Sequence, residues 1–219
     1  DLKPETAQTL SATYQLESAH DDWQLSLSPF YTRVDDYVDA EVIGTFNRGT
    51  SPVTARNILQ MTNVDATLKG IDAQYNQRWS QLLGVDEWRL SASAKYTHGE
   101  QHNGRPLYQI QPLTLRVALS QQWGGWEQTV AIEHVAEKDR VDPQRLENRT
   151  EAYELINWQL SYTAAQWQVN MGITNVLDEF YRQPLGGVNI AAQKAAANDG
   201  FDNIAGAGRS INFGVRYTF

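Results

Sequence analysis

The chain has 219 residues and a formal net charge of −8, and 41% of its residues are hydrophobic while 20% are charged. No stretch approaches 18 consecutive apolar residues, which excludes a transmembrane helix but leaves open a β-barrel, whose strands show only alternate residues to lipid. The absence of cysteine excludes disulfides and thiolate chemistry. An acidic balance without clustered Lys and Arg argues against a nucleic-acid partner.

Strict alternation of apolar and polar residues recurs through the first half of the chain and predicts strands with two different faces. The first four predicted strands cover residues 6–17, 23–31, 64–75 and 88–97. Pro29 predicts a local irregularity. At Lys69–Gly70 the alternation changes phase, which predicts a β-bulge. Long polar loops are expected at Asp36–Arg56 and at His98–Pro106.

The second half continues the same pattern to the last residue. The remaining predicted strands cover residues 113–120, 127–133, 153–162, 167–174 and 208–219. Gly124–Gly125 predicts a tight hairpin turn, because glycine readily supplies the positive φ that such turns need. Long loops are expected at Glu137–Glu151 and Asp178–Ala207. The final strand, Gly208 to Phe219, alternates large apolar residues with polar ones and ends on an aromatic residue.

The nine predicted strands are joined by connections that alternate between short and long. Short turns are expected at residues 18–22, 80–87, 124–125 and 163–166. Six of the seven Trp residues lie beside these turns: Trp23, Trp79, Trp88, Trp123, Trp126 and Trp167. An aromatic girdle at one membrane interface explains that distribution, so the pattern predicts an all-β, transmembrane, antiparallel up-and-down β-barrel. Because bare edge strands would leave backbone groups unpaired in lipid, we expect residues 1–219 to be the C-terminal portion of a larger barrel.

Charged residues that alternate with the apolar ones are expected on the inner wall of this barrel. They are Arg89, Lys95, Arg116, Glu127 and Glu133. They could contact another domain or an anionic ligand, or they could pair with one another across strands. His98 and His102 flank Glu100, so this loop could bind copper or zinc, or it could simply be solvated. Ser120 and His134 lack the motif and the acidic partner of a hydrolase, and we expect no enzyme activity.

Four segments, taken in order, resemble the C-terminal barrel of TonB-dependent outer-membrane receptors. Asp1-Leu2-Lys3-Pro4-Glu5-Thr6 is similar to the family's "NPxLKPE" segment. Asn63-Val64 with Lys69-Gly70-Ile71-Asp72 resembles its "N…A…KGxE" strand. Thr174-Asn175-Val176-Leu177-Asp178 with Phe180-Tyr181 resembles "NLFDxxY", and Gly208-Arg209 through Phe219 resembles the family's closing strand.

The resemblance implies a 22-stranded barrel with an N-terminal plug. It implies TonB-dependent uptake of a scarce metal chelate, such as a ferric siderophore, through the bacterial outer membrane, with no cofactor. The plug and the TonB-contacting segment would lie outside this chain. Short turns would be periplasmic and long loops extracellular. In the closing strand, Phe213, Tyr217 and Phe219 would form the signal that the barrel-insertion machinery recognises.

Alternatives remain open at this stage. Residues 184–187 and 206–209 resemble the last loop of a subgroup that includes copper-type receptors, although only Met61 and Met171 are available as soft ligands. The loop residues His98, His102, Arg182 and Arg209 are the expected ligand contacts, without a dedicated metal site. A passive porin or structural barrel, and a soluble β-rich binding domain, are the alternatives from other classes.

Overall fold

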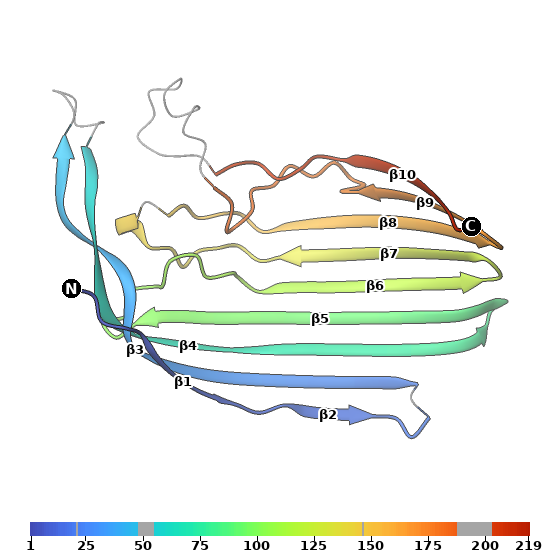
Figure 1. The fold of residues 1–219 in the computed structure, drawn as a ribbon, viewed down its shortest axis with the longest axis horizontal. Helices are drawn as coiled ribbons and strands as arrows, with labels where there is room; N and C mark the ends of the chain where they lie inside the picture. The colour runs from blue at the N-terminus through green and yellow to red at the C-terminus, as the bar shows by residue number, and fades with distance from the viewer. Residues whose placement is uncertain (21, 48–54, 146, 188–202) are drawn as a thin grey trace.

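The computed structural model describes residues 1–20, 22–47, 55–145, 147–187 and 203–219, which form one antiparallel sheet (Figure 1). The strands are β1 (Thr6–Ser11), β2 (Tyr14–Glu17), β3 (Trp23–Asn47), β4 (Ala55–Leu82), β5 (Val85–Gln101), β6 (Thr114–Trp123), β7 (Trp126–Val135), β8 (Tyr153–Ala164), β9 (Trp167–Thr174) and β10 (Ser210–Tyr217). A 3-10 turn, η2, covers Pro143–Arg145. In these ranges no helix is long and apolar enough to cross a membrane.

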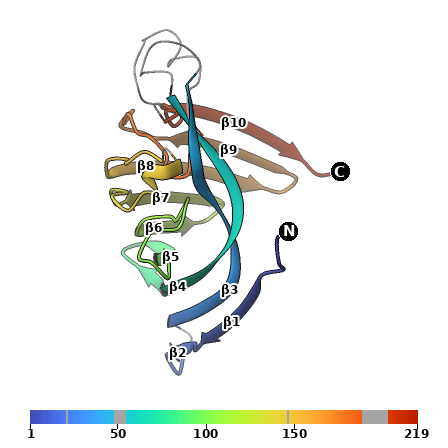
Figure 2. The ribbon, with the colours of Figure 1, turned by 90° about the vertical axis from the view of Figure 1, so that its left-hand side faces the viewer.

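The strands follow one another across the sheet in chain order, from β1 to β10. β1 and β2 both pair with β3 and form one pass, so the sheet contains the nine passes expected from the alternation. Their break lies beside Pro29, which has no N–H to donate, and this confirms the predicted irregularity. Figure 2 shows the sheet as an open arc with β1 at one end and β10 at the other. The antiparallel meander confirms the predicted fold class.

The connections separate by length onto the two ends of the sheet (Figure 1). The short turns lie at the same end as Phe219, and the longer connections lie at the opposite end. At the predicted hairpin turn, Gly124 has φ of 54° and joins Trp123 to Trp126, which lie directly opposite each other. The turn expected at residues 80–87 is tighter than predicted, because pairing continues to Leu82 and Val85. Residues 188–202 of the last predicted loop lie outside the described residues.

The long polar loop predicted at Asp36–Arg56 is wrong. β3 continues to Asn47 and β4 already begins at Ala55, with Asn47 paired to Ala55. A hairpin satisfies its own backbone hydrogen bonds whatever its side chains are, so a polar segment beyond the apolar part of the wall can still be strand. Figure 1 shows this part of β3 and β4 turning away from the direction of the other strands.

The β-bulge predicted at Lys69–Gly70 is also wrong. Gly70 pairs with Phe30 on one side and Thr97 on the other without a shift in register. The irregularity lies on β3 instead, between Val34 and Tyr37, where Asp36 has φ of 58°. The bulge was predicted on β4, whereas the irregularity at which the β3–β4 hairpin bends lies on β3.

A small core explains the phase change that suggested a bulge. Ala66 belongs to a buried cluster with Val34 and Leu107, and Leu68 and Ile110 pack against it. These β4 residues face the connection between β5 and β6, whereas Ile71 and the apolar residues after it lie on the other face of the sheet. Along β4, apolar side chains therefore lie on the face toward this connection up to Leu68 and on the opposite face from Ile71 onward. The alternation changes phase without an inserted residue.

We expect Gly70→Ala to destabilise the barrel. A Cβ at this position would lie 2.2 Å from the Tyr96 carbonyl oxygen and 2.7 Å from Cε1 of Phe30, so the strands must separate. Overpacking of this kind costs about 1–3 kcal/mol or more. Unfolding of the full-length receptor in urea, monitored by the loss of the heat-modifiable band on gels, measures the change in stability. Gly214→Ala is the matched control because nothing lies within 4 Å of its added Cβ; equal midpoints for the two variants would refute this account.

Candidate ligand-binding site

The register of the strands places the five predicted wall residues on one face of the sheet. On β5 this polar face carries Arg89 and Lys95, and in the register it continues through Arg116 on β6 and Glu133 on β7. The opposite, apolar face carries exposed side chains that include Val117, Leu119, Val130 and Ile132. An exposed band of this kind is unusual in a soluble domain and fits contact with lipid.

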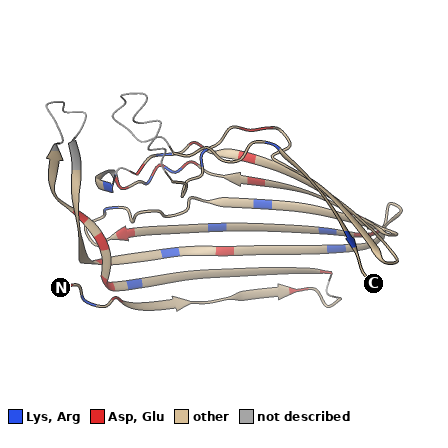
Figure 3. Cartoon of the chain, turned by 45° about the horizontal axis from the view of Figure 1, so that its top comes forward, with Lys and Arg blue, Asp and Glu red and all other residues tan. Residues whose placement is uncertain are grey.

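Two of the wall residues form an ion pair, and two cations do not. Arg89 donates from Nη2 to Glu127 Oε1 across the intervening strand β6. Lys95 and Arg116 have no carboxylate within 4 Å in the described part of the chain, and they line a hollow of about 260 Å³ together with Gln74, Asn76, Ser91 and Ser93. Charged residues of both signs occur along the wall as well as in the connections (Figure 3). The polar face therefore carries the ion pair Arg89–Glu127 and, separately, an open cationic hollow lined by Lys95 and Arg116.

Above the wall, a buried carboxylate joins the β3–β4 hairpin to two connections. Asp39 is 1% exposed. Its Oδ1 accepts a hydrogen bond from Arg145 Nη1 at 2.8 Å, and its Oδ2 accepts one from Gln101 Nε2 at 2.7 Å. Arg105 Nη2 lies 3.6 Å from the same Oδ2 and donates to the Ala40 carbonyl at 3.1 Å. We call Asp39, Gln101, Arg105, Asp142 and Arg145 the loop clasp.

A second buried pair extends this network to the connection before β10. Lys138 and Glu147 are 2% and 6% exposed, and Lys138 Nζ donates to Glu147 Oε1 at 2.5 Å. The same ammonium donates to the Pro184 carbonyl at 3.3 Å. Glu147 also accepts from the backbone N–H of Gln109 at 2.8 Å. The hairpin, the connections that contain Arg105 and Lys138, and Pro184 are thus held together by charged groups that are largely removed from water.

Two members of the clasp, Asp142 and Arg105, each have one buried polar atom without a hydrogen-bond partner among the described residues. Burial raises the pKa of the Asp142 carboxyl above its usual range, although a backbone hydrogen bond from Gln144 and the Arg105 guanidinium oppose the shift. Its Oδ2 lies 3.8 Å from Arg105 Nε, and neither atom has a hydrogen-bond partner. A raised folded-state pKa means that this group's stabilising contribution is complete below its unfolded pKa and is lost as pH rises through its folded pKa.

Among the described residues, none of the four predicted ligand contacts forms a hydrogen bond or ion pair with another. The loop expected from His98 begins at His102, because β5 continues to Gln101. His98 lies on the apolar face, opposite Lys69, with Nε2 3.0 Å from Glu100 Oε2. His102 is exposed. Arg182 lies 5.3 Å from the centre of the Phe180 ring, and the Arg209 backbone N–H donates to Asp178 Oδ1 at 2.8 Å.

Comparison with known proteins decides the family. A model of the TonB-dependent receptor-like β-barrel family matches residues 1–176. The chain belongs to this family. A search of curated protein sequences gave no match.

Solved structures of TonB-dependent receptors share the fold. The chain is 22% identical to the copper transporter OprC, with a TM-score of 0.83 over 100% of this chain and 32% of that one. It is 15% identical to the ferric yersiniabactin uptake receptor FyuA from Yersinia pestis, with a TM-score of 0.68 over 98% of this chain and 30% of that one. For the FrpB iron transporter from Neisseria meningitidis the identity is 14% and the TM-score 0.69, over 100% and 32%. The chain spans about a third of the length of these structures.

Two asparagines in the receptor motifs hold the chain in place. Asn63 exchanges two hydrogen bonds with the backbone of Lys3, at 2.8 and 3.0 Å, and donates to the Asp36 carbonyl. Asn175, which is 3% exposed and has φ of 51°, donates to the carbonyls of Glu179 and Ala207. These motif residues fasten the entry to β1 and the segment between β9 and β10, so their roles in this chain are structural.

The residues of a hydrolase are not brought together in this receptor barrel. Ser120 lies on the polar face and pairs with the Thr129 hydroxyl at 2.8 Å. His134 lies on the apolar face, opposite Leu115, with Nδ1 3.2 Å from Glu154 Oε1. The matched structures are receptors and transporters. The clasp, by contrast, was missed in the sequence, and only the mixture of acidic and basic residues in the loop at 137–151 hinted at it.

Proposed function

We propose that the full-length receptor containing this chain takes up a metal chelate through the outer membrane, with energy delivered through TonB. Family membership supports the transport class. The long connections would face the cell exterior and the short turns the periplasm, with a plug and a TonB-contacting segment supplied by other parts of the same protein. The clasp would hold the connections at the outer mouth in a fixed arrangement, which lowers the entropy cost of binding a ligand there.

The observation that carries the choice of cargo is the cationic hollow at Lys95 and Arg116. Both side chains lack a carboxylate partner in the described ranges, and both project from the polar face of the wall. Ligands that hold a hard metal through carboxylate and other oxygen donors are usually anionic. Arg and Lys recognise such groups by charge-assisted hydrogen bonds. The hollow therefore favours an anionic ferric chelate passing along this wall.

The double substitution Lys95→Glu with Arg116→Glu tests the proposal in the full-length receptor. We expect binding and uptake of ferric citrate, used as a probe in a panel of anionic ferric chelates, to weaken by about tenfold for each charge-assisted hydrogen bond that is removed, which is about 1.4 kcal/mol. Radiolabelled iron accumulation by intact cells, normalised to receptor level, measures the effect. Lys69→Glu reverses one charge, half of the change in the double variant, on the apolar face. Equal reductions in both variants, or no reduction for any chelate in the panel, would contradict the role of the hollow.

Copper is the second candidate. The observation that favours it is the TM-score of 0.83 with the copper transporter OprC, against 0.68 with FyuA. Within the described residues no group of three or more His, Asp or Glu side chains could hold a metal ion. Met171 lies on the apolar face, opposite Leu160 and Phe213, while Met61 pairs with Ala40 in the β3–β4 hairpin. Comparing copper and iron accumulation with and without TonB separates these cargoes from each other and from passive diffusion through a porin.

A further inference from the structure

The barrel wall contains a gap beside the upper part of β5. β6 begins at Thr114, opposite Lys95, whereas β5 continues to Gln101. The connection between them folds onto the polar face, because a Cβ built on Gly99 would lie 3.0 Å from the Cδ1 atoms of both Leu107 and Ile110. From Tyr96 to His98, therefore, no strand in the described part of the chain lies beside β5 on its β6 side.

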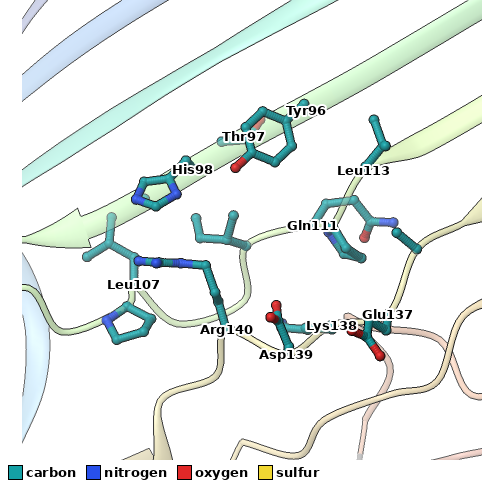
Figure 4. Close-up of a pocket in the computed structure, with 15 residues that line it drawn as sticks. Tyr96, Thr97, His98, Leu107, Gln111, Leu113, Glu137, Lys138, Asp139 and Arg140 are labelled. Atoms are coloured by element: carbon teal, nitrogen blue, oxygen red, sulfur yellow. The ribbon is translucent and has the colours of Figure 1, made fainter.

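A pocket of about 160 Å³ occupies this gap (Figure 4). Its apolar lining comes from the edge of β5, the connection before β6 and the segment after β7, and includes Tyr96, Ile110, Pro112, Leu113 and Ala136. Tyr96 and His98 belong to the apolar face, since they pair with Ile71 and Lys69. Leu107 and Ile110 form the floor on the polar side. The pocket therefore lies between the apolar-face side chains of β5 and the connection packed on the polar face.

The backbone of Thr97 points into the same gap. On the β6 side of β5, the Gly99 carbonyl accepts from Leu107 and the Gln101 N–H donates to Arg105. Residues two apart on a strand direct their backbone groups to the same side, so the N–H and C=O of Thr97 face the pocket. No strand partner meets them among the described residues. Leaving a buried backbone group without a hydrogen-bond partner costs about 1–3 kcal/mol, so a partner for Thr97 is favoured here.

We propose that this pocket binds a lipid of the surrounding bilayer, with a short length of acyl chain on its apolar lining and the ester or amide linkage hydrogen-bonded to Thr97. A cavity of about 150 Å³ accommodates an apolar group the size of benzene, so the volume suits part of one chain. The lining also contains Glu137, Lys138, Asp139 and Arg140, and Arg140 Nη2 lies 3.4 Å from Glu100 Oε2. Because these charges are of both signs, the acyl chain and its linkage, not an anionic headgroup, are the recognised parts.

The test uses the full-length receptor, purified in detergent, washed, and examined by native mass spectrometry after incubation with phosphatidylethanolamine vesicles. Ala136→Trp fills the pocket. Ala92→Trp places the same ring on the apolar face of β5, opposite Val117 and away from the gap. We expect the wild type and Ala92→Trp to retain a bound lipid after washing and Ala136→Trp to lose it. Loss of the lipid from all three proteins, or retention by Ala136→Trp, would overturn the proposal.

Because a Trp at this position could prevent folding, Leu113→Phe provides a milder filling of the same pocket. Heat-modifiability on gels establishes that each variant is folded before its lipid content is compared. A folded Leu113→Phe variant should retain less lipid than the wild type. Unchanged retention in that folded variant would also count against occupation of the pocket by an acyl chain.

Discussion

Replacing Asp39 with Ala should release the β3–β4 hairpin from the neighbouring connections. The substitution removes the acceptor for the part-buried Arg145 guanidinium and for the buried Gln101 amide. Breaking a buried ion pair by removing one partner costs about 3–5 kcal/mol. Hydrogen exchange measured on the full-length receptor should therefore show faster exchange in the hairpin and in the connections 102–113 and 136–152. The backbone amides of the other strands should remain protected from exchange, because their inter-strand hydrogen bonds do not depend on the clasp.

Asp35→Ala is the matched control, since it removes the same side chain from the same strand. Asp35 pairs with Arg33 at 3.0 Å, but both side chains are well exposed, at 38% and 63%. Exposed pairs contribute about 0–1 kcal/mol. Exchange should therefore change little in this variant. Equal acceleration in the two variants would mean that the hairpin is held by something other than the clasp.

The two variants Asp39→Ala and Asp35→Ala should also differ in how tightly the receptor binds the ferric citrate probe. If the clasp fixes the connections at the mouth of the barrel, its removal adds an ordering cost to every binding event there. Asp39→Ala would then weaken binding to intact cells without changing receptor level, whereas Asp35→Ala would not. A defect confined to receptor level would instead assign the clasp to folding alone.

The wall of this barrel was readable from its sequence because each strand contacts two different media. Residues on the lipid-facing side, such as Leu90 and Ile132, are apolar, whereas the other face carries charged residues such as Arg89 and Glu133. Apolar and polar residues therefore alternate along each strand. Local chemistry also predicted the turn at Gly124 and the irregularity at Pro29. These features depend on neighbours in the chain or on the adjacent strand.

The upper hairpin and the clasp were not readable in that way. Above the apolar band β3 carries apolar residues without regular alternation, since Val42 and Ile43 are adjacent and Ile43 and Phe46 are exposed, so the pattern that marks a strand disappears there. Asp39 and Arg145 are 106 residues apart and meet only because the hairpin bends at Asp36. Predicting a ligand contact from its position in a loop was equally unreliable. His98 was expected in a loop, but it lies in β5, on the apolar face.

Phe219→Asp should sharply reduce the amount of receptor in the outer membrane. Tyr217 packs on Trp167 with ring centres 4.7 Å apart, and Phe219 lies edge-on to Tyr217 at 5.0 Å. Tyr217 also donates its hydroxyl hydrogen to Gln166 Oε1 at 2.7 Å. The Phe219 side chain itself is fully exposed, so it contributes little packing to the folded sheet. By resemblance to the family's closing strand, we expect its role to be recognition by the insertion machinery.

The expected signature is therefore a several-fold drop in receptor level, with unchanged stability and ligand affinity in the molecules that do assemble. Thr218→Asp adds the same charge one residue earlier, where the backbone N–H of Thr218 donates to the Gln166 carbonyl at 2.9 Å. Because adjacent residues of a strand face opposite sides, this control spares the aromatic face. Quantitative immunoblots of outer-membrane fractions compare the variants. Normal levels of Phe219→Asp, or an equal drop in Thr218→Asp, would show that the aromatic side chain is not what the insertion step recognises.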